Sequence, residues 1–458
     1  MDLIIDNELI ITEPTKEVHK WCKDKLITAN PEYAKKERLG LWLGNTPRHL
    51  YLYKVKGDSL ILPYGCKEQI SRFKEFDSIT NKLTPEKIKI ACSGLSLYDY
   101  QQKAVNAMAK IDCGILQSPA GSGKTQMGIG LAAKLGYKTL WLTHTHDLLK
   151  QSYDRACLFM DKEDLGKITA GKIEIGNTVT FATVQTLCKA DLTALKNEWD
   201  CIIVDECHRV AGSPTSAMQF YKVLSALSAK HKYGLSATVH RADGLIKTTY
   251  ALLGGIAYKV PDEAVRDKIM QVKIKKCELP TKMPYEAVDT DGTLIYTKLI
   301  NALSDDIERN KNIVCDLVNE KDHYCLILSD RLKHLQNLID LMPNELKEQC
   351  VMVTGKGQGK AIRDRAIELM RSGEKHYLFA SYKLAKEGLD IPRLDRLFLA
   401  TPQKDYAVIV QSIGRIARTY EGKNQPVCYD YVDKPILFLD RMFNKRKTHY
   451  KKAGCCFG

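Results

Sequence analysis

The chain has 458 residues, too many for one hydrophobic core, so we expect two or three domains. Its 44% hydrophobic and 27% charged residues are ordinary for a globular protein, and no apolar run approaches the roughly 20 residues of a membrane span. The net charge of +14 favours a polyanionic partner, nucleic acid before a membrane, although a merely basic protein would carry it too. The 15 cysteines include no Cys-x-x-Cys pair, and the N-terminus lacks the basic start of a signal peptide. We therefore expect a cytoplasmic protein with reduced thiols, no zinc ribbon and no membrane partner.

Residues 1–92 carry no nucleotide-binding motif and have the pattern of a small α+β domain. Helical patterns cover 15–26 and 66–76, and two strands at 50–56 and 59–62 are joined by a Gly-Asp turn typical of a hairpin. Aromatic and basic side chains mix here, which suits stacking on bases and contacts with phosphates, but core aromatics beside solvated lysines give the same pattern. The sequence leaves both interpretations open for Trp42, Arg48, Tyr51, Tyr53, Lys54 and Lys56.

Residues 93–262 alternate strand and helix patterns, which predicts a parallel sheet. A strand pattern at 114–116 and a helix pattern at 126–135 enclose a Gly-rich turn that ends in Gly-Lys-Thr, typical of a phosphate-binding loop. Lys124 is expected to reach the β- and γ-phosphates of ATP, and the Thr125 hydroxyl to hold Mg²⁺. A chance Gly/Ser loop is the alternative, and the strand–loop–helix context argues against it. Gln101 precedes a helix pattern that runs to Lys110 and is expected to hydrogen-bond an adenine edge. The other predicted ATP-binding residues of this block are Ser118, Ala120, Gly121, Ser122, Gly123, Lys124 and Thr125.

A second motif, which is acidic, follows the buried strand pattern at 201–204. Asp205 is expected to position Mg²⁺ through its water shell, and Glu206 to orient and deprotonate the attacking water. His208 is expected to sense the nucleotide. An acidic strand end is common by itself, but together with a phosphate-binding loop it predicts ATP hydrolysis.

Several other strand patterns end in polar residues, in both this block and a second alternating block at 263–458. Those of the first block follow strands near the phosphate-binding loop, and we predict that they contact a nucleic-acid backbone together with the strand-end residues of the second block. These residues are Thr143, His144, Thr183, Arg241, Ser329, Thr354 and Ser381. A metal site is the alternative for His144 and His146, which share one strand face, but the sequence offers no third ligand.

The second block contains no further phosphate-binding loop, but a helix pattern near 411–418 carries two arginines. Arg415 and Arg418 are three residues apart, so on a helix they share one face. We expect them to reach across a cleft to the γ-phosphate as arginine fingers. A solvated basic helix face is the alternative.

The ordered set of motifs resembles that of superfamily 2 helicases. The resemblance covers residues from about 93 to 435 and rests on Tyr100-Gln101, Ser118 to Thr125, Asp205 to His208, Ser236-Ala-Thr238, Gly388-Leu-Asp390 and Gln411 to Arg418. The Asp-Glu-Cys-His sequence is closer to the Asp-Glu-x-His groups than to the DEAD-box RNA helicases. The resemblance to superfamily 2 helicases adds Gly388, Asp390 and Gln411 to the expected ATP-binding residues. The departures are Ser118 at the first position of the loop and Tyr98 where the family often has Arg.

The N-terminal region resembles the small first domain of the UvsW-type phage recombination helicases, at Asn30-Pro31 and Leu62-Pro63-Tyr64-Gly65. The resemblance implies two tandem RecA-like domains, 93–262 and 263–458, after the α+β domain. It further implies an ATP- and Mg²⁺-dependent enzyme that remodels branched DNA in recombination, repair or replication, in the host cytoplasm if a phage encodes it. A duplex-DNA translocase subunit of a restriction or repair complex and an RNA helicase are the alternatives. A binding module with a vestigial ATP site is disfavoured, because Lys124, Glu206 and Arg418 are all present.

Overall fold

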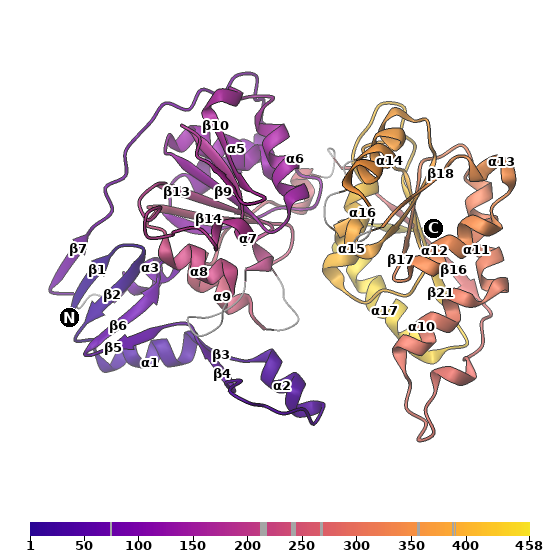
Figure 1. Ribbon diagram of the computed structural model, residues 1–458, viewed down its shortest axis with the longest axis horizontal. Coiled ribbons are helices and arrows are strands. Elements are labelled where there is room, and N and C mark those ends of the chain that lie inside the picture. Colours follow the sequence, from indigo (N-terminus) through magenta and orange to yellow (C-terminus); the bar gives the residue numbers. More distant parts are fainter. Residues whose placement is uncertain are drawn as a thin grey trace. The chain divides into compact units, whose positions relative to one another are not determined.

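The computed structural model describes residues 1–73, 76–210, 218–239, 244–265, 269–354, 358–386, 389 and 391–458 (Figure 1). The chain divides into two compact units. Unit 1 comprises residues 1–119 and 123–261, and unit 2 comprises residues 120–122 and 262–458. Within the described part of the chain, no helix has the length and apolar character needed to cross a bilayer.

Unit 1 begins with a five-stranded sheet in the order β5-β6-β2-β1-β7. Its strands are β1 (Asp2–Ile5), β2 (Glu8–Thr12), β5 (Lys54–Lys56), β6 (Ser59–Pro63) and β7 (Ser78–Asn81). Alternate residues of β1 and β2 are buried, and they pack with Val18 and Cys22 of α1 (Lys16–Lys25) in one apolar core. The helix expected at 15–26 is confirmed as α1, and Thr15 caps it by accepting a hydrogen bond from the Val18 N–H.

Two details of this region differ from the prediction. The expected strand 50–56 is divided into β4 (His49–Tyr51), which pairs with β3 (Ile27–Ala29), and β5, which forms the expected hairpin with β6. The chain bends between β4 and β5 because Leu52 turns its side chain into the core. The expected helix 66–76 is reduced to a 3-10 turn followed by α3 (Lys67–Ile70).

The N-terminal sheet is fixed to the rest of unit 1 by buried polar contacts. The Lys232 ammonium is fully buried and donates to the carbonyl oxygens of Asn7 at 3.3 Å, Leu224 at 2.8 Å and Leu227 at 2.9 Å. The Tyr64 hydroxyl donates to the Lys230 carbonyl at 2.7 Å. A lysine that joins three carbonyls from two parts of the chain satisfies groups that would otherwise be costly to bury.

An eight-stranded sheet forms the rest of unit 1, in the order β11-β10-β12-β9-β13-β14-β8-β15. All neighbours are parallel except β10 and β11, and the central strands are buried along their whole length, as a sheet with helices on both faces requires. The strands are β8 (Cys113–Gln117), β9 (Thr139–Thr143), β10 (Leu165–Thr169), β11 (Lys172–Glu174), β12 (Val179–Thr183), β13 (Cys201–Asp205), β14 (His231–Ser236) and β15 (Ile256–Lys259). The helices are α4 (Asp99–Met108), α5 (Lys124–Leu135), α6 (His146–Ala156), α7 (Val184–Leu187), α8 (Gln219–Ala226) and α9 (Ile246–Leu253).

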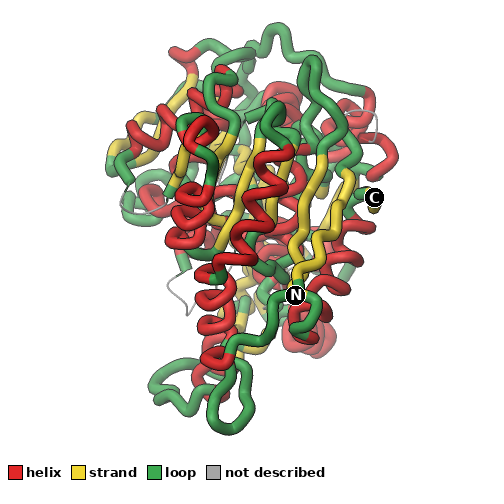
Figure 2. The backbone as a smooth tube through the Cα atoms, turned by 90° about the vertical axis from the view of Figure 1, so that its right-hand side faces the viewer, coloured by secondary structure: helices red, strands yellow, loops and turns green. Residues whose placement is uncertain are grey.

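Unit 2 is a second parallel α/β layer, with strand order β18-β19-β17-β20-β21-β16-β22, and Figure 2 shows helices beside the strands. The strands are β16 (Lys273–Leu279), β17 (Cys325–Ser329), β18 (Cys350–Val353), β19 (Tyr377–Ser381), β20 (Arg396–Leu399), β21 (Val427–Asp433) and β22 (Cys456–Phe457). The helices are α10 (Tyr296–Asp305), α11 (Ile307–Asn319), α12 (Leu332–Leu341), α13 (Asn344–Lys347), α14 (Lys360–Ser372), α15 (Tyr382–Lys386), α16 (Tyr406–Ile416) and α17 (Leu437–Lys452). The expected α/β fold with parallel sheets is confirmed.

One buried histidine makes the stability of unit 2 depend on pH. His334 Nδ1 lies 3.0 Å from the Ser329 hydroxyl and Nε2 lies 2.9 Å from Asn310 Oδ1, and burial lowers the pKa of His334 to about 3, with a smaller effect of Arg309. The unfolded chain therefore binds a proton below about pH 6.5 that the folded unit does not bind. We expect the free energy of unfolding to fall below pH 6.5, by up to about 1.4 kcal/mol per pH unit from this group.

Denaturant unfolding at pH 7.5 and pH 5 measures this effect. The His334→Gln variant, which can hydrogen bond but does not titrate, should lose less stability between the two values than the wild type. Equal losses in both proteins would show that His334 does not titrate differently on folding.

Candidate active site

The phosphate-binding loop lies between β8 and α5. Gly121 and Gly123 have φ angles of +83° and +77°, a region that favours glycine, and Gly123 is the residue at which α5 begins. Gly123 has no side chain that could cap the first N–H groups of α5. These N–H groups and the positive end of the helix dipole are therefore suited to binding an anion. The local geometry fits a nucleotide phosphate.

Gln101 of α4 contacts this loop. Its Oε1 accepts a hydrogen bond from the Tyr98 N–H at 3.0 Å, and a Cβ on Gly123 would collide with its Nε2. The side chain is buried, so its amide is held in one orientation against the loop. The predicted adenine contact of Gln101 stays a prediction, but the structure brings the residue to the expected neighbourhood.

The acidic motif stands at the carboxyl end of β13. Glu206 has a φ of +49°, a left-handed backbone conformation that costs a residue with a side chain about 1–3 kcal/mol. Its N–H donates to Asp205 Oδ1 at 2.9 Å, and the Ser152 hydroxyl lies 3.4 Å from Asp205 Oδ2. No sequence motif marked Ser152, because its contact with Asp205 depends on how α6 packs.

Electrostatics at this strand end suit a cation. Burial, and after it the charge of Glu206, raises the pKa of Asp205 to about 7, although the charge of Lys124 opposes the rise. Two carboxylates close together in a buried position are costly unless a positive charge joins them. Lys124 supplies one positive charge, and a divalent cation would supply more.

His208 joins the acidic motif to the end of β14. Its Nδ1 lies 3.2 Å from Glu206 Oε2 and 3.0 Å from the Ser236 hydroxyl, which itself donates to the Thr238 carbonyl at 2.6 Å. Since Ser236 donates its own proton to Thr238, its oxygen accepts from His208, so Nδ1 of His208 carries the proton. The Ser236 carbonyl also accepts from the Ser118 N–H at 3.0 Å. His208 therefore lies between Glu206 and Ser236, and the Ser236 backbone in turn contacts the phosphate-binding loop.

Three predicted nucleic-acid contacts of unit 1 lie at neighbouring strand ends, because Thr143 and Thr183 are paired across β9 and β12. Both threonines are buried, with the Thr143 hydroxyl 3.2 Å from the Thr145 carbonyl and the Thr183 hydroxyl 3.1 Å from Thr186 Oγ1. The His144 carbonyl accepts from Gln185 Nε2 at 2.6 Å. Their roles stay predictions, and the two hydroxyls are already used inside the protein.

The metal alternative at His144 and His146 gains no support from the part of the chain that the structure describes. No group of three or more His, Cys, Asp and Glu residues suited to a metal ion is found there. His146 Nδ1 instead lies 3.1 Å from the Thr169 hydroxyl. Three other predicted site residues, Arg241, Gly388 and Asp390, lie outside the described residues.

In unit 2 the predicted contacts also gather at one edge of the sheet. Ser329, Thr354 and Ser381 end or follow β17, β18 and β19, which are adjacent and parallel. Ser329 is buried against His334, whereas Ser381 is partly exposed. The Thr354 N–H donates to Gln358 Oε1 at 2.7 Å. The structure brings the three residues together and does not test what they bind.

The two arginines do not share a helix face. α16 ends at Ile416, and Arg418 forms a β-bridge with Ile269, while the Ala417 carbonyl accepts from the Met270 N–H at 2.8 Å. Because residues 417–418 pair with residues 269–270, they do not continue the helix. The prediction that Arg415 and Arg418 lie on one face of a helix is therefore wrong. Arg415 is on the helix and donates from Nε to the Ala385 carbonyl at 2.9 Å, and Gln411 is buried one turn earlier.

These features define a class: a nucleotide-binding parallel α/β unit followed by a second parallel α/β unit. Two family models match the chain, "Type III restriction enzyme, res subunit" over residues 94–241 and "Helicase conserved C-terminal domain" over residues 309–420, and together they cover more than half of it. The chain belongs to the superfamily 2 helicases. It is therefore an ATP-dependent helicase, an enzyme that hydrolyses ATP and binds nucleic acid.

Relatives span most of the chain. It is 27% identical over 98% of its length to a putative ATP-dependent RNA helicase of Acanthamoeba polyphaga mimivirus, covering 84% of that protein. It is 23% identical over 80% of its length to the ATP-dependent DNA helicase uvsW of Enterobacteria phage T4, covering 74% of that protein. A fragment structure of a putative HsdR subunit of a type I restriction enzyme from Vibrio vulnificus matches 91% of this chain and 78% of its own, with a TM-score of 0.56 and 18% identity. At that identity the structural match supports the fold only.

Proposed function

We propose that this helicase remodels branched DNA, by migrating junctions and regressing forks during recombination, repair or replication. The observation that carries the proposal is the similarity to the phage T4 protein named an ATP-dependent DNA helicase, over 80% of the chain. The N-terminal residues that resemble UvsW-type helicases add support. The net charge of +14 suits a partner with many phosphates.

Domain boundaries at 92 and 262 are part of the proposal. The five-stranded sheet has an apolar core of its own, although it packs within unit 1. The first and second RecA-like domains would then cover 93–262 and 263–458.

The proposed ATP site uses the residues around the phosphate-binding loop. Lys124 and the N–H groups at the start of α5 hold the β- and γ-phosphates, and Thr125 and Asp205 hold Mg²⁺. Burial, and after it the charge of Glu206, raises the pKa of Asp205, and a bound divalent cation would favour its ionised carboxylate. Mg²⁺ commonly uses one or two protein ligands and completes its shell with phosphate oxygens and water, so a site with few carboxylates fits it.

Glu206 is the proposed general base. Its strained backbone holds the carboxylate at the strand end, beside His208, where it can orient a water molecule for attack on the γ-phosphate. Arg415 and Arg418 are proposed to stabilise the charge on that phosphate, and Gln411 to bind the nucleotide. Strand-end residues of both units would then hold the nucleic-acid backbone.

ATP hydrolysis tests the choice of substrate. We expect turnover by the wild type to rise most with a four-way junction or fork, less with duplex or single-stranded DNA, and least with single-stranded RNA, all at one salt concentration. The Glu206→Gln variant gives the background in each case. Stimulation by RNA alone would contradict the proposal and favour an RNA helicase, the activity that the mimivirus relative's name states. Stimulation by duplex DNA without any strand displacement or junction migration would favour a duplex translocase.

A further inference from the structure

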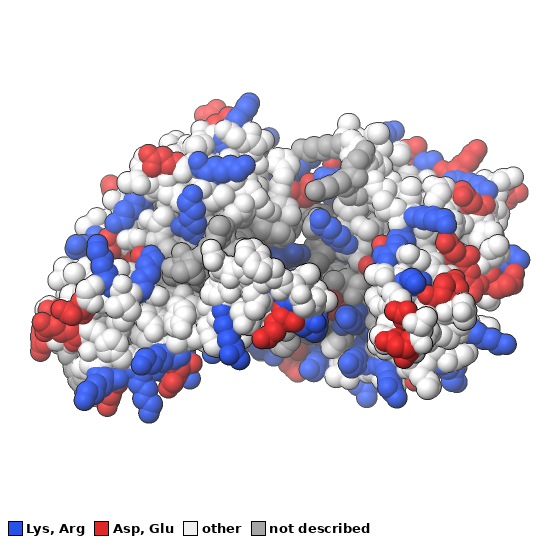
Figure 3. Space-filling view, turned by 60° about the horizontal axis from the view of Figure 1, so that its bottom comes forward, with Lys and Arg blue, Asp and Glu red and all other residues white. Residues whose placement is uncertain are grey.

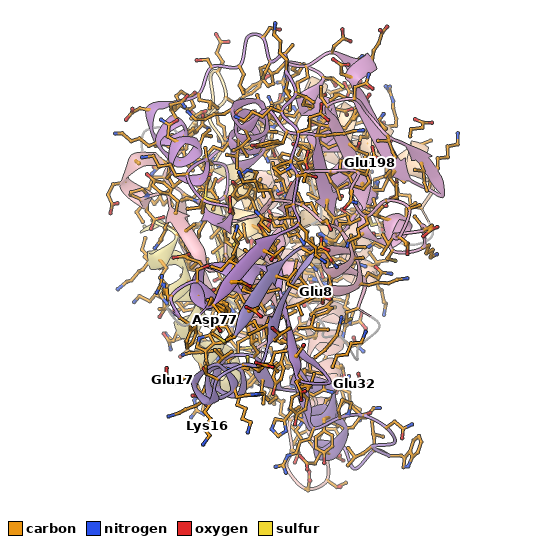
Figure 4. The ribbon with its side chains drawn as sticks, turned by 90° about the vertical axis from the view of Figure 1, so that its left-hand side faces the viewer. Glu8, Lys16, Glu17, Glu32, Asp77 and Glu198 are labelled. Carbon is orange, nitrogen blue, oxygen red and sulfur yellow. The ribbon has the colours of Figure 1, made fainter. Side chains whose placement is uncertain are left out.

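An arm formed by residues 27–51 projects from the N-terminal part of unit 1. It consists of the β3–β4 ribbon, the helix α2 (Pro31–Arg38) and a tip loop, residues 39–46 (Figure 1). Figure 4, in which Glu32 marks α2 and Glu8 marks β2, shows the arm extending away from the five-stranded sheet. No nucleotide motif or proposed ATP contact falls within it.

The tip loop presents an exposed tryptophan. Trp42 is 88% exposed, whereas Trp141 and Trp199 are fully buried and Trp21 is partly buried. The indole lies over Gly44, where a Cβ would stand 2.8 Å from the ring carbon Cζ3. The flanking Leu39 and Leu41 are each 54% exposed. Exposing this much apolar surface at one point is unfavourable unless a partner covers it.

Hydrogen bonds fix the conformation of the loop that carries Trp42. The Leu41 N–H donates to the Lys36 carbonyl at 2.9 Å, and the Lys36 ammonium donates to Thr46 Oγ1 at 2.7 Å. At the base of the arm Asn30 is buried. It accepts from the Glu32 N–H at 3.0 Å and donates to the Pro47 carbonyl at 2.8 Å. These bonds close the two ends of the loop on each other, so the indole is held in place before any partner arrives.

The charge around the arm identifies the chemistry of the partner. Residues 16–56 hold ten Lys and Arg against four Asp and Glu. Lys16, Lys20 and Lys23 are exposed and four and three residues apart, which places them along one side of α1. Lys35, Arg38 and Arg48 are exposed on the arm itself. Figure 3 shows that Lys and Arg predominate over Asp and Glu on the side of unit 1 turned to the viewer. A polyanion with flat apolar surfaces matches both the charge and the indole.

The base of the arm is attached next to the site already described. Leu50 of β4 packs on Leu245, and the Lys247 ammonium donates to the Ile27 carbonyl at 3.2 Å. Leu245 and Lys247 lie at the start of α9, which follows the carboxyl end of β14 and Ser236 in the chain. The arm is therefore anchored at the edge of the sheet where ligands of parallel α/β proteins bind.

We propose that the 27–51 arm holds an unpaired base of the nucleic-acid substrate, with Trp42 stacked on the base and the basic residues of α1 and α2 on the neighbouring phosphates. Tyr53 packs against the N-terminal core, as the interpretation of these aromatic residues as core residues expects. Tyr51 is half exposed and Trp42 is exposed, as stacking on bases would require. The inference rests on nucleic-acid binding by this helicase and not on its preference for branched DNA.

Intrinsic tryptophan fluorescence tests the contact. Trp42 is the most exposed tryptophan, so titrating the full-length wild type with single-stranded DNA should quench its emission. The Trp42→Phe variant should lose most of that quenching. Equal quenching in both proteins would overturn the proposal.

Affinity gives the second measurement. Base–aromatic stacking predicts that Trp42→Ala weakens binding of single-stranded DNA by about 5- to 150-fold, and Trp42→Phe by less. An oligonucleotide of abasic sites should bind the wild type and Trp42→Ala equally, because it offers phosphates without bases. Tyr285→Ala removes a 94% exposed aromatic from unit 2 and should bind like the wild type. Thermal unfolding checks that each variant is folded.

Three outcomes would overturn the inference. The first is unchanged affinity of Trp42→Ala for normal single-stranded DNA, and the second is an equal loss on abasic DNA. The third is a wild-type dimer in size-exclusion chromatography that Trp42→Ala abolishes, since the indole would then be covered by a second copy of the chain. The proposed remodelling of branched DNA fails separately, in the wild-type hydrolysis measurements with different nucleic acids.

Discussion

The Glu206→Gln variant is expected to hydrolyse ATP about 10²- to 10⁴-fold more slowly than the wild type at saturating nucleic acid. Glutamine keeps the size of the side chain but cannot accept the proton of the attacking water. Since Lys124 and the start of α5 are untouched, the affinity for ATP should remain close to that of the wild type. Steady-state hydrolysis and equilibrium binding of a fluorescent ATP analogue measure the two quantities separately.

Two further variants separate chemistry from strain. Glu206→Gly should be equally inactive but at least as stable to heat, because glycine adopts a φ of +49° at little cost. Glu345→Gln changes an exposed glutamate in unit 2 and should leave hydrolysis unchanged. If Glu206→Gln kept more than about a tenth of the wild-type rate, the general base would have to be another residue.

The Arg309→Met variant is expected to lose about 3–5 kcal/mol of unfolding free energy in unit 2. Arg309 of α11 and Asp433 at the end of β21 are both fully buried, with Nε 2.9 Å from Oδ1 and Nη2 3.3 Å from Oδ2. Nη1 also donates to the Ala400 carbonyl at 2.9 Å. Removing the arginine leaves a buried carboxylate without its partner, and the cost of that charge dominates the loss. Denaturant unfolding measures it.

The double variant Arg309→Met, Asp433→Leu should recover much of this loss, because it removes the stranded charge as well. On the same helix, Lys311 forms an exposed ion pair with Glu308 at 2.8 Å. Lys311→Met should change stability by less than about 0.5 kcal/mol, since exposed pairs contribute little. Similar losses from Arg309→Met and Lys311→Met would show that burial does not govern the cost.

Sequence patterns located the local parts of the candidate site. The phosphate-binding loop and the acidic motif could be recognised because each is a short run of residues whose strand, turn and helix neighbours have their own periodicity. The helix after Thr15, the helix expected to run to Lys110 and most strand ends could be predicted for the same reason. Parallel strands then place their carboxyl ends at one edge, so polar strand ends far apart in sequence could be expected near one another.

Features that depend on contacts between distant residues could not be predicted in this way. Arg418 leaves the helix because residues 269–270 pair with its segment, and no local pattern announces that pairing. Ser152 reaches Asp205 only through the packing of α6 against the sheet. The strand expected at 50–56 is divided because the core takes the Leu52 side chain.

The sequence alone determined the helicase motifs, the parallel α/β architecture and the general chemistry, because these depend on residue types at short spacing. Only the tertiary structure decided which side chains are available to a ligand. It buried the Thr143 and Thr183 hydroxyls in internal hydrogen bonds, placed Tyr53 against the N-terminal core and left Trp42 exposed on the arm. Exposure is a sum over all neighbours in space, and most of those neighbours are distant in the chain.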